Sequence, residues 1–231
     1  MVLLGDIHGY LDSIVQLVDK SKLKDTYIIQ VGDFEIGFRK DNDQTIGRLN
    51  KWLSKFNVTL LVIRGNHDNP NWFNGDKVWS HVKFLEDYTV MRIEDKNILF
   101  VGGAISINRK QKAATGEWFP GEVFKLDIPK LESFRDIDMV VTHNAPTFVY
   151  PFGCDAPIIH KFAKNDPTLI ADLIAERKEL NIMHDILIKN NYIKSWHYGH
   201  FHQSHEMNYG SCYFQLLGVC EAAVYKNSIF D

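Results

Sequence analysis

The sequence predicts an α/β fold in which two β-sheets face each other and helices cover their outer sides. Two patterns in the 231-residue chain support this prediction. The first two thirds alternates apolar runs typical of buried strands with segments of helical periodicity, an order that indicates parallel strands joined by right-handed crossovers. The end of the chain is rich in short strand candidates. Because no linker-like composition and no internal repeat interrupts the sequence, we expect a single domain over residues 1–231.

The elements are expected in the following order. Early strands are predicted at residues 2–4, 27–31 and 58–63, each of which ends close to a glycine followed by a polar residue. Apolar residues at the spacing of one helix face predict two helices between these strands: Leu11, Ile14, Val15 and Val18, then Ile46, Leu49, Leu53 and Phe56. Shorter strands are expected at residues 81–85, 88–92, 98–101 and 137–142. A helix with proline in its first turn is predicted from Asp166 to about Ile188, and final strands at residues 195–198, 204–208, 212–217 and 222–225.

Composition excludes several classes of protein. With 26 Lys and Arg against 29 Asp and Glu, the chain carries a formal charge of −3, which argues against an extended nucleic-acid partner. Its apolar stretches are far shorter than the roughly 20 residues that cross a bilayer. The opening MVLLGDIHG leads directly into the first expected strand, so we expect neither a membrane segment nor a signal peptide. Three cysteines without a C-x-x-C pair indicate thiols in a reducing compartment, and we predict a cytoplasmic protein.

Side chains that can bind metal ions gather at the ends of the expected strands. Five clusters combine them with a small residue: Gly5-Asp6-Ile7-His8-Gly9, Gly32-Asp33, Gly65-Asn66-His67-Asp68, Thr142-His143-Asn144 and Gly199-His200-Phe201-His202. The carboxyl ends of parallel strands lie along one edge of a sheet, where ligands bind in open α/β folds. This placement would bring seven side chains together: Asp6, His8, Asp33, Asn66, His143, His200 and His202. Residues two apart in an extended segment point the same way, so Asp6 with His8, and His200 with His202, can each bind one centre.

Taken one at a time these residues are weak signals, because a single histidine is more often a hydrogen-bonded structural residue than a ligand. Their repetition at strand ends favours a metal site, since burying so many carboxylates and imidazoles without a cation costs several kcal/mol each. Oxygen and imidazole donors without a thiolate suit Mn, Fe, Co, Ni or Zn better than Ca or an all-oxygen Mg site. Seven side chains are too many for one ion and fit two divalent ions, roughly 3.5–4 Å apart, that share a bridging carboxylate.

The ordered set GDIHG, GD, GNHD, TH and GHFH, spread over residues 5–202, resembles the calcineurin-like metallophosphoesterase superfamily. The resemblance implies a four-layer αββα sandwich of two facing mixed β-sheets flanked by helices. It also implies the division of the ligands: Asp6, His8 and His202 for one metal ion, Asn66, His143 and His200 for a second, and Asp33 as the bridge. The expected cofactors are two divalent transition-metal ions, manganese first, with Fe, Ni, Zn or Co also possible choices for the site.

His67 and Asp68 follow Asn66 in the third cluster. By the same resemblance, His67 lies beside the metals as general acid for the leaving oxygen, or as a charge stabiliser on the phosphoryl group, and Asp68 orients its ring. The implied reaction hydrolyses a phosphomonoester or phosphodiester: a hydroxide that bridges the two metals attacks phosphorus opposite the ester oxygen, without a phosphoenzyme. A small-molecule or nucleotide-like substrate is expected.

The second cluster departs from the protein phosphatase branch of this superfamily. That branch continues GDxVDRG and GNHE, whereas this chain has GDFEIG at residues 32–37, without the phosphate-binding arginine, and Asp68 ends the third cluster. A protein phosphatase is therefore disfavoured relative to a phosphoesterase acting on small substrates. Two further functions stay open. One is a catalytically silent scaffold that keeps the fold to bind a partner, and the second is a nuclease, which the acidic charge balance disfavours.

Three residues outside the clusters are candidates for contacting substrate. Residues 102–109, GGAISINR, with EWFP at 117–120, resemble uncharacterised bacterial and phage members of the superfamily. Arg109 is a candidate phosphate-contacting cation and Trp118 a candidate platform for a base or ring; a surface arginine and a core tryptophan are equally well supported. Arg64, just before Gly65, is either a strand-end packing residue or a phosphate contact.

Overall fold

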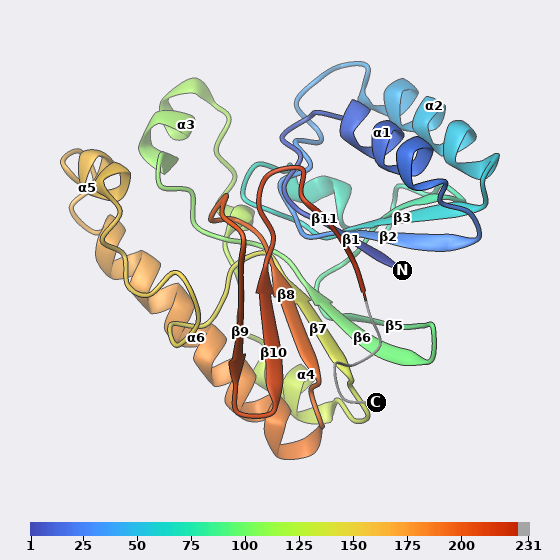
Figure 1. Ribbon diagram of the computed structural model, residues 1–231. Helices are drawn as coiled ribbons and strands as arrows, with labels where there is room; N and C mark the ends of the chain where they lie inside the picture. Colours follow the sequence, from blue (N-terminus) through green and yellow to red (C-terminus); the bar gives the residue numbers. More distant parts are fainter. Residues whose placement is uncertain (226–231) are drawn as a thin grey trace.

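Two mixed β-sheets face each other in the computed structural model, which describes residues 1–225; residues 226–231, the end of the predicted domain, lie outside the described part (Figure 1). The first sheet has the strand order β11-β1-β2-β3-β4. Its four parallel strands are β1 (Val2–Leu4), β2 (Thr26–Gln30), β3 (Val58–Val62) and β4 (Val82–Phe84). The edge strand β11 (Ala222–Val224) pairs antiparallel with β1.

The second sheet has the strand order β5-β6-β7-β8-β10-β9. Its four central strands are parallel: β6 (Lys96–Val101), β7 (Met139–Thr142), β8 (Ser195–Tyr198) and β10 (Cys212–Leu216). The edge strands β5 (Thr89–Ile93) and β9 (His205–Tyr209) are antiparallel to their neighbours. Each predicted strand is present, with ends that differ from the prediction by at most two residues.

Helices cover the outer face of each sheet (Figure 1). α1 (Asp12–Ser21) and α2 (Asn42–Ser54) lie against the first sheet, and α4 (Ile128–Ser133) and α6 (Leu169–Asn190) lie against the second. Two shorter helices, α3 (Arg109–Thr115) and α5 (Pro157–Ala163), occupy connections, as do single 3-10 turns at Pro70–Trp72 and Pro120–Glu122. No helix within residues 1–225 combines the length and the apolarity that a bilayer span requires.

The alternation of side chains along each strand produces the layers. Neighbouring residues of a strand point to opposite faces, so Leu3 packs between the two sheets while Leu4 packs toward α1 and α2. In the second sheet, Val141 lies in the same inter-sheet core as Leu3, whereas Val140 packs with Leu180 of α6. The resulting order of helix, sheet, sheet and helix confirms the predicted four-layer αββα sandwich.

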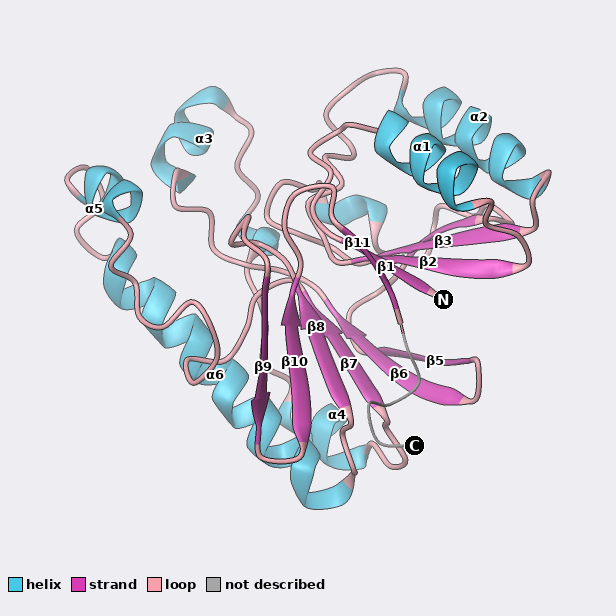
Figure 2. Cartoon of the chain, in the orientation of Figure 1, coloured by secondary structure: helices cyan, strands magenta, loops and turns pink. Residues whose placement is uncertain are grey.

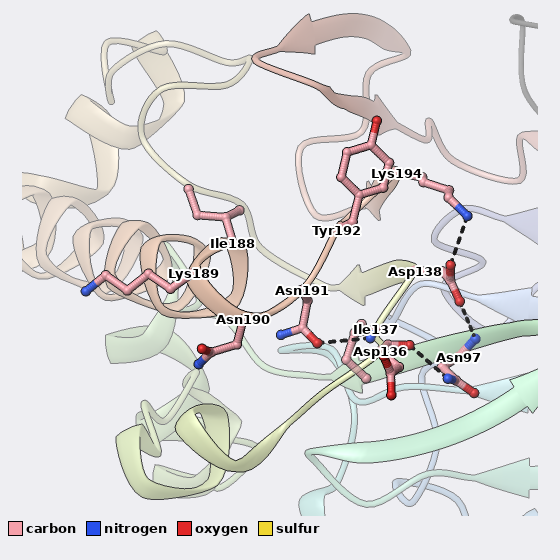
Figure 3. Close-up of a pocket in the computed structure, with 10 residues that line it drawn as sticks. All are labelled: Asn97, Asp136, Ile137, Asp138, Ile188, Lys189, Asn190, Asn191, Tyr192 and Lys194. Carbon is pink, nitrogen blue, oxygen red and sulfur yellow. Dashed lines mark hydrogen bonds and ion pairs between the residues drawn. The ribbon is translucent and has the colours of Figure 1, made fainter.

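The two ends of the parallel strands differ in chemistry. Figure 2 shows the loops that follow β1, β2, β3, β7 and β8 gathered where the two sheets converge. At the opposite end, where β6, β7 and β8 begin, there is a polar depression of about 480 Å³ (Figure 3). In this depression Asp138 accepts hydrogen bonds from the backbone of Asn97 and from Lys194, each at 3.0 Å. None of the predicted ligands lines this depression, so the candidate site lies at the other end.

Candidate metal centre

All seven predicted ligands follow the carboxyl ends of five parallel strands. They are Asp6 and His8 after β1, Asp33 after β2, Asn66 after β3, His143 after β7, and His200 and His202 after β8. Six of them form two groups, and within each group the potential ligand atoms lie within 4.8 Å of one another: Asp6, His8, Asp33 and His202, and then Asp33, His143 and His200. Asp33 belongs to both groups. Side chains from distant segments therefore converge at one place, as the strand-end placement predicts.

The first group combines two buried carboxylates with two partly accessible imidazoles. The Nε2 atoms of His8 and His202 lie 2.9 Å apart. Nε2 of His202 is 3.5 Å from Oδ2 of Asp6, and Nε2 of His8 is 3.9 Å from Oδ2 of Asp33. A cation that accepts a lone pair from each of these four side chains would satisfy all of them at once.

The second group contains His143, whose hydrogen bonds fix its tautomer. Nδ1 of His143 lies 2.8 Å from the backbone oxygen of Val31, so this nitrogen carries the proton of the neutral ring and Nε2 then presents a lone pair. That lone pair faces Oδ1 of Asn66 at 3.0 Å and Oδ1 of Asp33 at 3.2 Å. The amide nitrogen of Asn66 donates to Oγ of Ser106 at 3.0 Å, which leaves Oδ1 for the site. Three buried acceptors that face one another repel unless a cation or a proton lies among them, and the donor set therefore fits a divalent metal.

Backbone strain is concentrated at the same residues. His8, Asp33, His200 and His202 all have left-handed φ values, of 43°, 57°, 72° and 55°. Residues other than glycine cost about 1–3 kcal/mol in sparsely populated backbone regions, and such strain persists where it serves a functional site. Each of these four residues belongs to at least one of the two ligand groups.

The glycines that precede the ligands make room for ligands from neighbouring loops. A Cβ at Gly199 would overlap Oδ1 of Asp6, and a Cβ at Gly65 would overlap Oδ1 of Asp33. The loops approach so closely that only a residue without a side chain fits between a strand end and the carboxylate of the next loop.

Gly199→Ala is therefore expected to displace the Asp6 carboxylate, to destabilise the protein by about 1–3 kcal/mol through overpacking, and to weaken metal binding. Gly47→Ala is the matched control, because Gly47 lies in α2 with no atom within 4 Å of an added Cβ. The control is expected to raise stability by about 0.4–1 kcal/mol. Thermal unfolding and Mn²⁺ titration measure both effects; a Gly199→Ala protein with unchanged metal affinity would contradict this steric explanation.

Burial and mutual charge set the protonation states in the centre. Burial raises the pKa of Asp6 well above its ordinary value. Burial alone would also raise the pKa of Asp33. The neighbouring imidazoles, His143 foremost, have a larger opposite effect and hold the pKa of Asp33 well below its ordinary value. Burial lowers the pKa of His8 to about 4 and that of His200 well below its usual range, so both rings are neutral at pH 7. Burial also lowers the pKa of His143, but the adjacent Asp33 carboxylate outweighs this effect and raises it to about 9.

The raised pKa of His143 has a measurable consequence for metal binding. In the metal-free protein at pH 7 this ring is protonated, and a divalent cation must displace the proton before it can use Nε2. We expect release of at least one proton on metal binding at pH 7, with metal affinity rising as the pH is raised toward about 9. Calorimetry in buffers of different ionisation enthalpy measures the release. A binding enthalpy independent of buffer would contradict this expectation.

His67 and Asp68 occupy different positions relative to the centre. The backbone N–H of His67 donates to Oδ1 of Asp33 at 2.7 Å, and its ring packs edge-on against His8 with centroids 5.2 Å apart, at the partly exposed side of the site. Asp68 is fully buried, and its carboxylate accepts four backbone N–H groups, those of Gly65 and of residues 34–36, at 2.8–3.3 Å. Its hydrogen bonds thus hold the loops after β2 and β3 together, whereas the sequence predicted that it orients the His67 ring.

Arg64 lies in the protein interior. Its guanidinium donates to the backbone oxygens of Gly121 and Glu122, each at 2.6 Å, and to the Asp87 carboxylate at 2.7 Å. Of the two roles predicted for Arg64, these contacts support strand-end packing, because they direct its donors at protein acceptors.

Arg109 begins α3 and forms ion pairs with Asp166 and Asp172, each at 2.6 Å. These pairs tie α3 to the start of α6, and they use the guanidinium that the sequence assigned to phosphate. Trp118 is 36% exposed, as the proposed platform role requires. The next residue, Phe119, packs against Phe38, so this segment contacts the loop after β2 that also carries Asp33.

The sequence did not single out three buried residues that surround Asn66, namely Ser106, Lys112 and Glu122. Two of them lie within or just after the glycine-rich run at residues 102–109, but in a sequence a lysine in a polar segment is indistinguishable from a surface lysine. The sequence offers no clear signal for them, because residues 102–107, GGAISI, are mostly apolar and the polar run begins only at Asn108.

The model of the calcineurin-like phosphoesterases matches residues 1–204, a span that contains every predicted ligand. The chain belongs to the calcineurin-like phosphoesterase family. Membership agrees with the mixed sheets, with the helices outside them and with the two groups of potential metal ligands at the strand ends. A search of curated proteins gave no match for this chain.

Solved structures similar to this calcineurin-like phosphoesterase cover most of the chain at low identity. One is a phosphopantetheinyl hydrolase from Mycobacterium tuberculosis (12% identity, 95% of this chain and 90% of that chain, TM-score 0.45). A second is a putative 5'-nucleotidase from Staphylococcus aureus in complex with alpha-ketoglutarate (14% identity, 95% of this chain and 48% of that chain, TM-score 0.49). The chain spans about half the length of that protein. A third is an archaeal phosphodiesterase (12% identity, 95% of this chain and 85% of that chain, TM-score 0.38).

Proposed function

We propose that this protein is a dinuclear metal-dependent phosphoesterase that hydrolyses small phosphomonoesters or phosphodiesters, with a nucleotide-like substrate as the leading candidate. The observation that carries the proposal is the buried Asp33 carboxylate, which belongs to both groups of converging ligand atoms. A carboxylate shared in this way suits two cations in one site better than one cation. The family match supports hydrolysis at a phosphate ester.

The chain supplies two sets of ligands. Asp6, His8 and His202 would hold one ion, and Asn66, His143 and His200 the other, with Asp33 between them. When bound, divalent cations lower the pKa of coordinated water and neutralise charge on phosphate oxygens. Carboxylate, amide oxygen and imidazole donors without a thiolate suit Mn, Fe, Co, Ni and Zn, and of these manganese is the metal proposed first.

His67 has the placement that a proton donor to the leaving oxygen needs. Its backbone is held by Asp33 while its ring lies beside His8 at the accessible side of the site. In the protonated form the ring would donate its proton to the departing alkoxide, or stabilise the charge that develops on the phosphoryl oxygens.

The proposed substrate class rests on the net charge of the chain, and the proposed cellular compartment rests on its cysteines. The formal charge of −3 supports a small phosphate ester over an extended nucleic acid. Cys154, Cys212 and Cys220 are all unpaired, which supports a reducing, cytoplasmic setting.

A substrate panel on metal-stripped protein tests the proposed function. Mn²⁺, Fe²⁺, Ni²⁺, Zn²⁺ and Mg²⁺ are added separately, and hydrolysis of p-nitrophenyl phosphate, bis(p-nitrophenyl) phosphate, mononucleotides and cyclic nucleotides is followed. Stripped protein is expected to be inactive and Mn²⁺ to restore turnover on small esters. Full metal occupancy without hydrolysis across the panel would favour a silent scaffold, and preferential cleavage of single-stranded or duplex DNA at low salt would favour a nuclease.

A further inference from the structure

A buried polar network lies directly behind Asn66. Lys112 of α3 donates through Nζ to the backbone oxygen of Asn66 at 2.6 Å, to Oγ of Ser106 at 2.8 Å and to Oε2 of Glu122 at 2.7 Å. The other carboxylate oxygen of Glu122 accepts the backbone N–H of Ser106 at 2.9 Å. All four residues are at most 6% exposed. A buried ammonium is costly unless it is paired and fully hydrogen-bonded, and this one has an acceptor for each of its three protons.

The network assigns a hydrogen-bond partner to each side of the Ser106 hydroxyl. Because Lys112 donates to Oγ of Ser106, the remaining acceptor capacity of this oxygen is free for the amide nitrogen of Asn66, which donates to it at 3.0 Å. The hydroxyl proton of Ser106 points to the backbone oxygen of Asn66, at 3.5 Å. An inverted amide would need the hydroxyl proton of Ser106 to turn from the backbone oxygen to Oδ1 of Asn66, and Oγ would lose the amide N–H that it now accepts.

The orientation of the Asn66 amide matters at the second ligand group. With the nitrogen held by Ser106, Oδ1 faces Nε2 of His143 and can bind a cation together with it. An inverted amide would place its NH₂ group against Nε2 of His143, where it cannot bind a cation and would fill the position of the ion. Glu122 neutralises the charge of Lys112, so the ammonium adds little net repulsion toward a cation in the site.

We propose that Ser106, Lys112 and Glu122 are positioning residues that hold the Asn66 amide with its oxygen toward the second metal ion. The inference rests on the proposed dinuclear function and deepens it. All three residues lie in the connection between β6 and α4, which contains α3. This connection would then set the affinity of the second metal position without contacting the substrate.

Mn²⁺ titration of metal-stripped protein by calorimetry tests this proposal independently of catalysis. The parent is expected to bind two ions with distinguishable affinities. Ser106→Ala and Lys112→Met are expected to weaken the second equivalent by about 10–100-fold, the usual effect of removing a hydrogen-bond partner of a metal ligand, and to leave the first equivalent unchanged. Circular dichroism of the metal-free proteins shows which variants fold, and if Lys112→Met does not fold, Ser106→Ala alone decides.

Two matched variants separate positioning from general stability. Lys110→Met makes the same chemical change on the exposed side of α3 and is expected to bind both equivalents as the parent does. Ser106→Thr keeps the hydroxyl and is expected to retain the affinity that Ser106→Ala loses.

Three outcomes would overturn the proposal. They are a folded Ser106→Ala protein with parental affinity for the second equivalent, a Ser106→Thr protein as weak as Ser106→Ala, and a parent that binds fewer than two ions. Only the last of these also contradicts the proposed dinuclear function.

Discussion

Replacing Asp33 with asparagine is expected to lower kcat/KM for a phosphate ester by about 10³-fold or more, because the loss of one cation removes several kcal/mol of charge stabilisation. Oδ1 of Asp33 accepts the backbone N–H of His67, so the new amide keeps its oxygen there and directs its NH₂ group toward His8 and the first ligand group. We therefore expect bound Mn²⁺ to fall from two ions to one, with the first position lost.

Asp138→Asn is the control for this experiment. Asp138 is also a hydrogen-bonded carboxylate that pairs with a neighbouring lysine, but it lies at the opposite end of the second sheet. It is expected to leave metal content and kcat/KM unchanged. Metal analysis and steady-state kinetics measure both variants; two bound ions and parental turnover in Asp33→Asn would rule out Asp33 as the shared ligand.

Replacing His67 with alanine is expected to lower kcat by about 10²–10⁴-fold, the usual contribution of a general acid, while metal content stays at the parental level. The ring borders the first ligand group but is not part of either group of converging atoms. The loss should be small for p-nitrophenyl phosphate, whose leaving group needs little protonation, and large for an alkyl phosphate, whose alkoxide must be protonated.

His160→Ala removes an exposed imidazole from α5 and serves as the control, with parental kinetics expected. A loss in His67→Ala that is equal for good and poor leaving groups would instead assign the ring to charge stabilisation on the phosphoryl group. Parental activity of His67→Ala on alkyl phosphates would show that the residue has neither role.

The positions of the strands along the chain and the convergence of the candidate ligands could be predicted because both depend on local patterns. Short apolar runs such as Val2–Leu4 and Val58–Val62 are followed within four residues by a glycine and a polar residue. The rule that parallel strands align their carboxyl ends places these polar residues together. α3, α4 and α5, of six or seven residues each, were not predicted because two turns contain too few positions for a periodic apolar face.

The roles of individual polar side chains depended on contacts that sequence spacing does not contain. Arg109 was proposed to contact phosphate because it lies in the loop after Gly102 and Gly103, but it pairs with Asp166, more than fifty residues away along the chain. Lys112 points inward because Glu122 provides a buried counter-charge. Asp68 follows His67 directly and was predicted to orient it, yet its carboxylate is turned to the backbone amides of a different loop. The helix predicted from Asp166 begins at Leu169, and Asp166 precedes it as the ion-pair partner of Arg109.

Anomalous diffraction from crystals soaked in Mn²⁺, recorded at the manganese edge, tests the central claim most directly. The account predicts two anomalous peaks roughly 3.5–4 Å apart, one among Asp6, His8 and His202 and the other among Asn66, His143 and His200, with the Asp33 carboxylate between them. A single peak away from Asp33, or no peak at these strand ends in crystals of active protein, would contradict it.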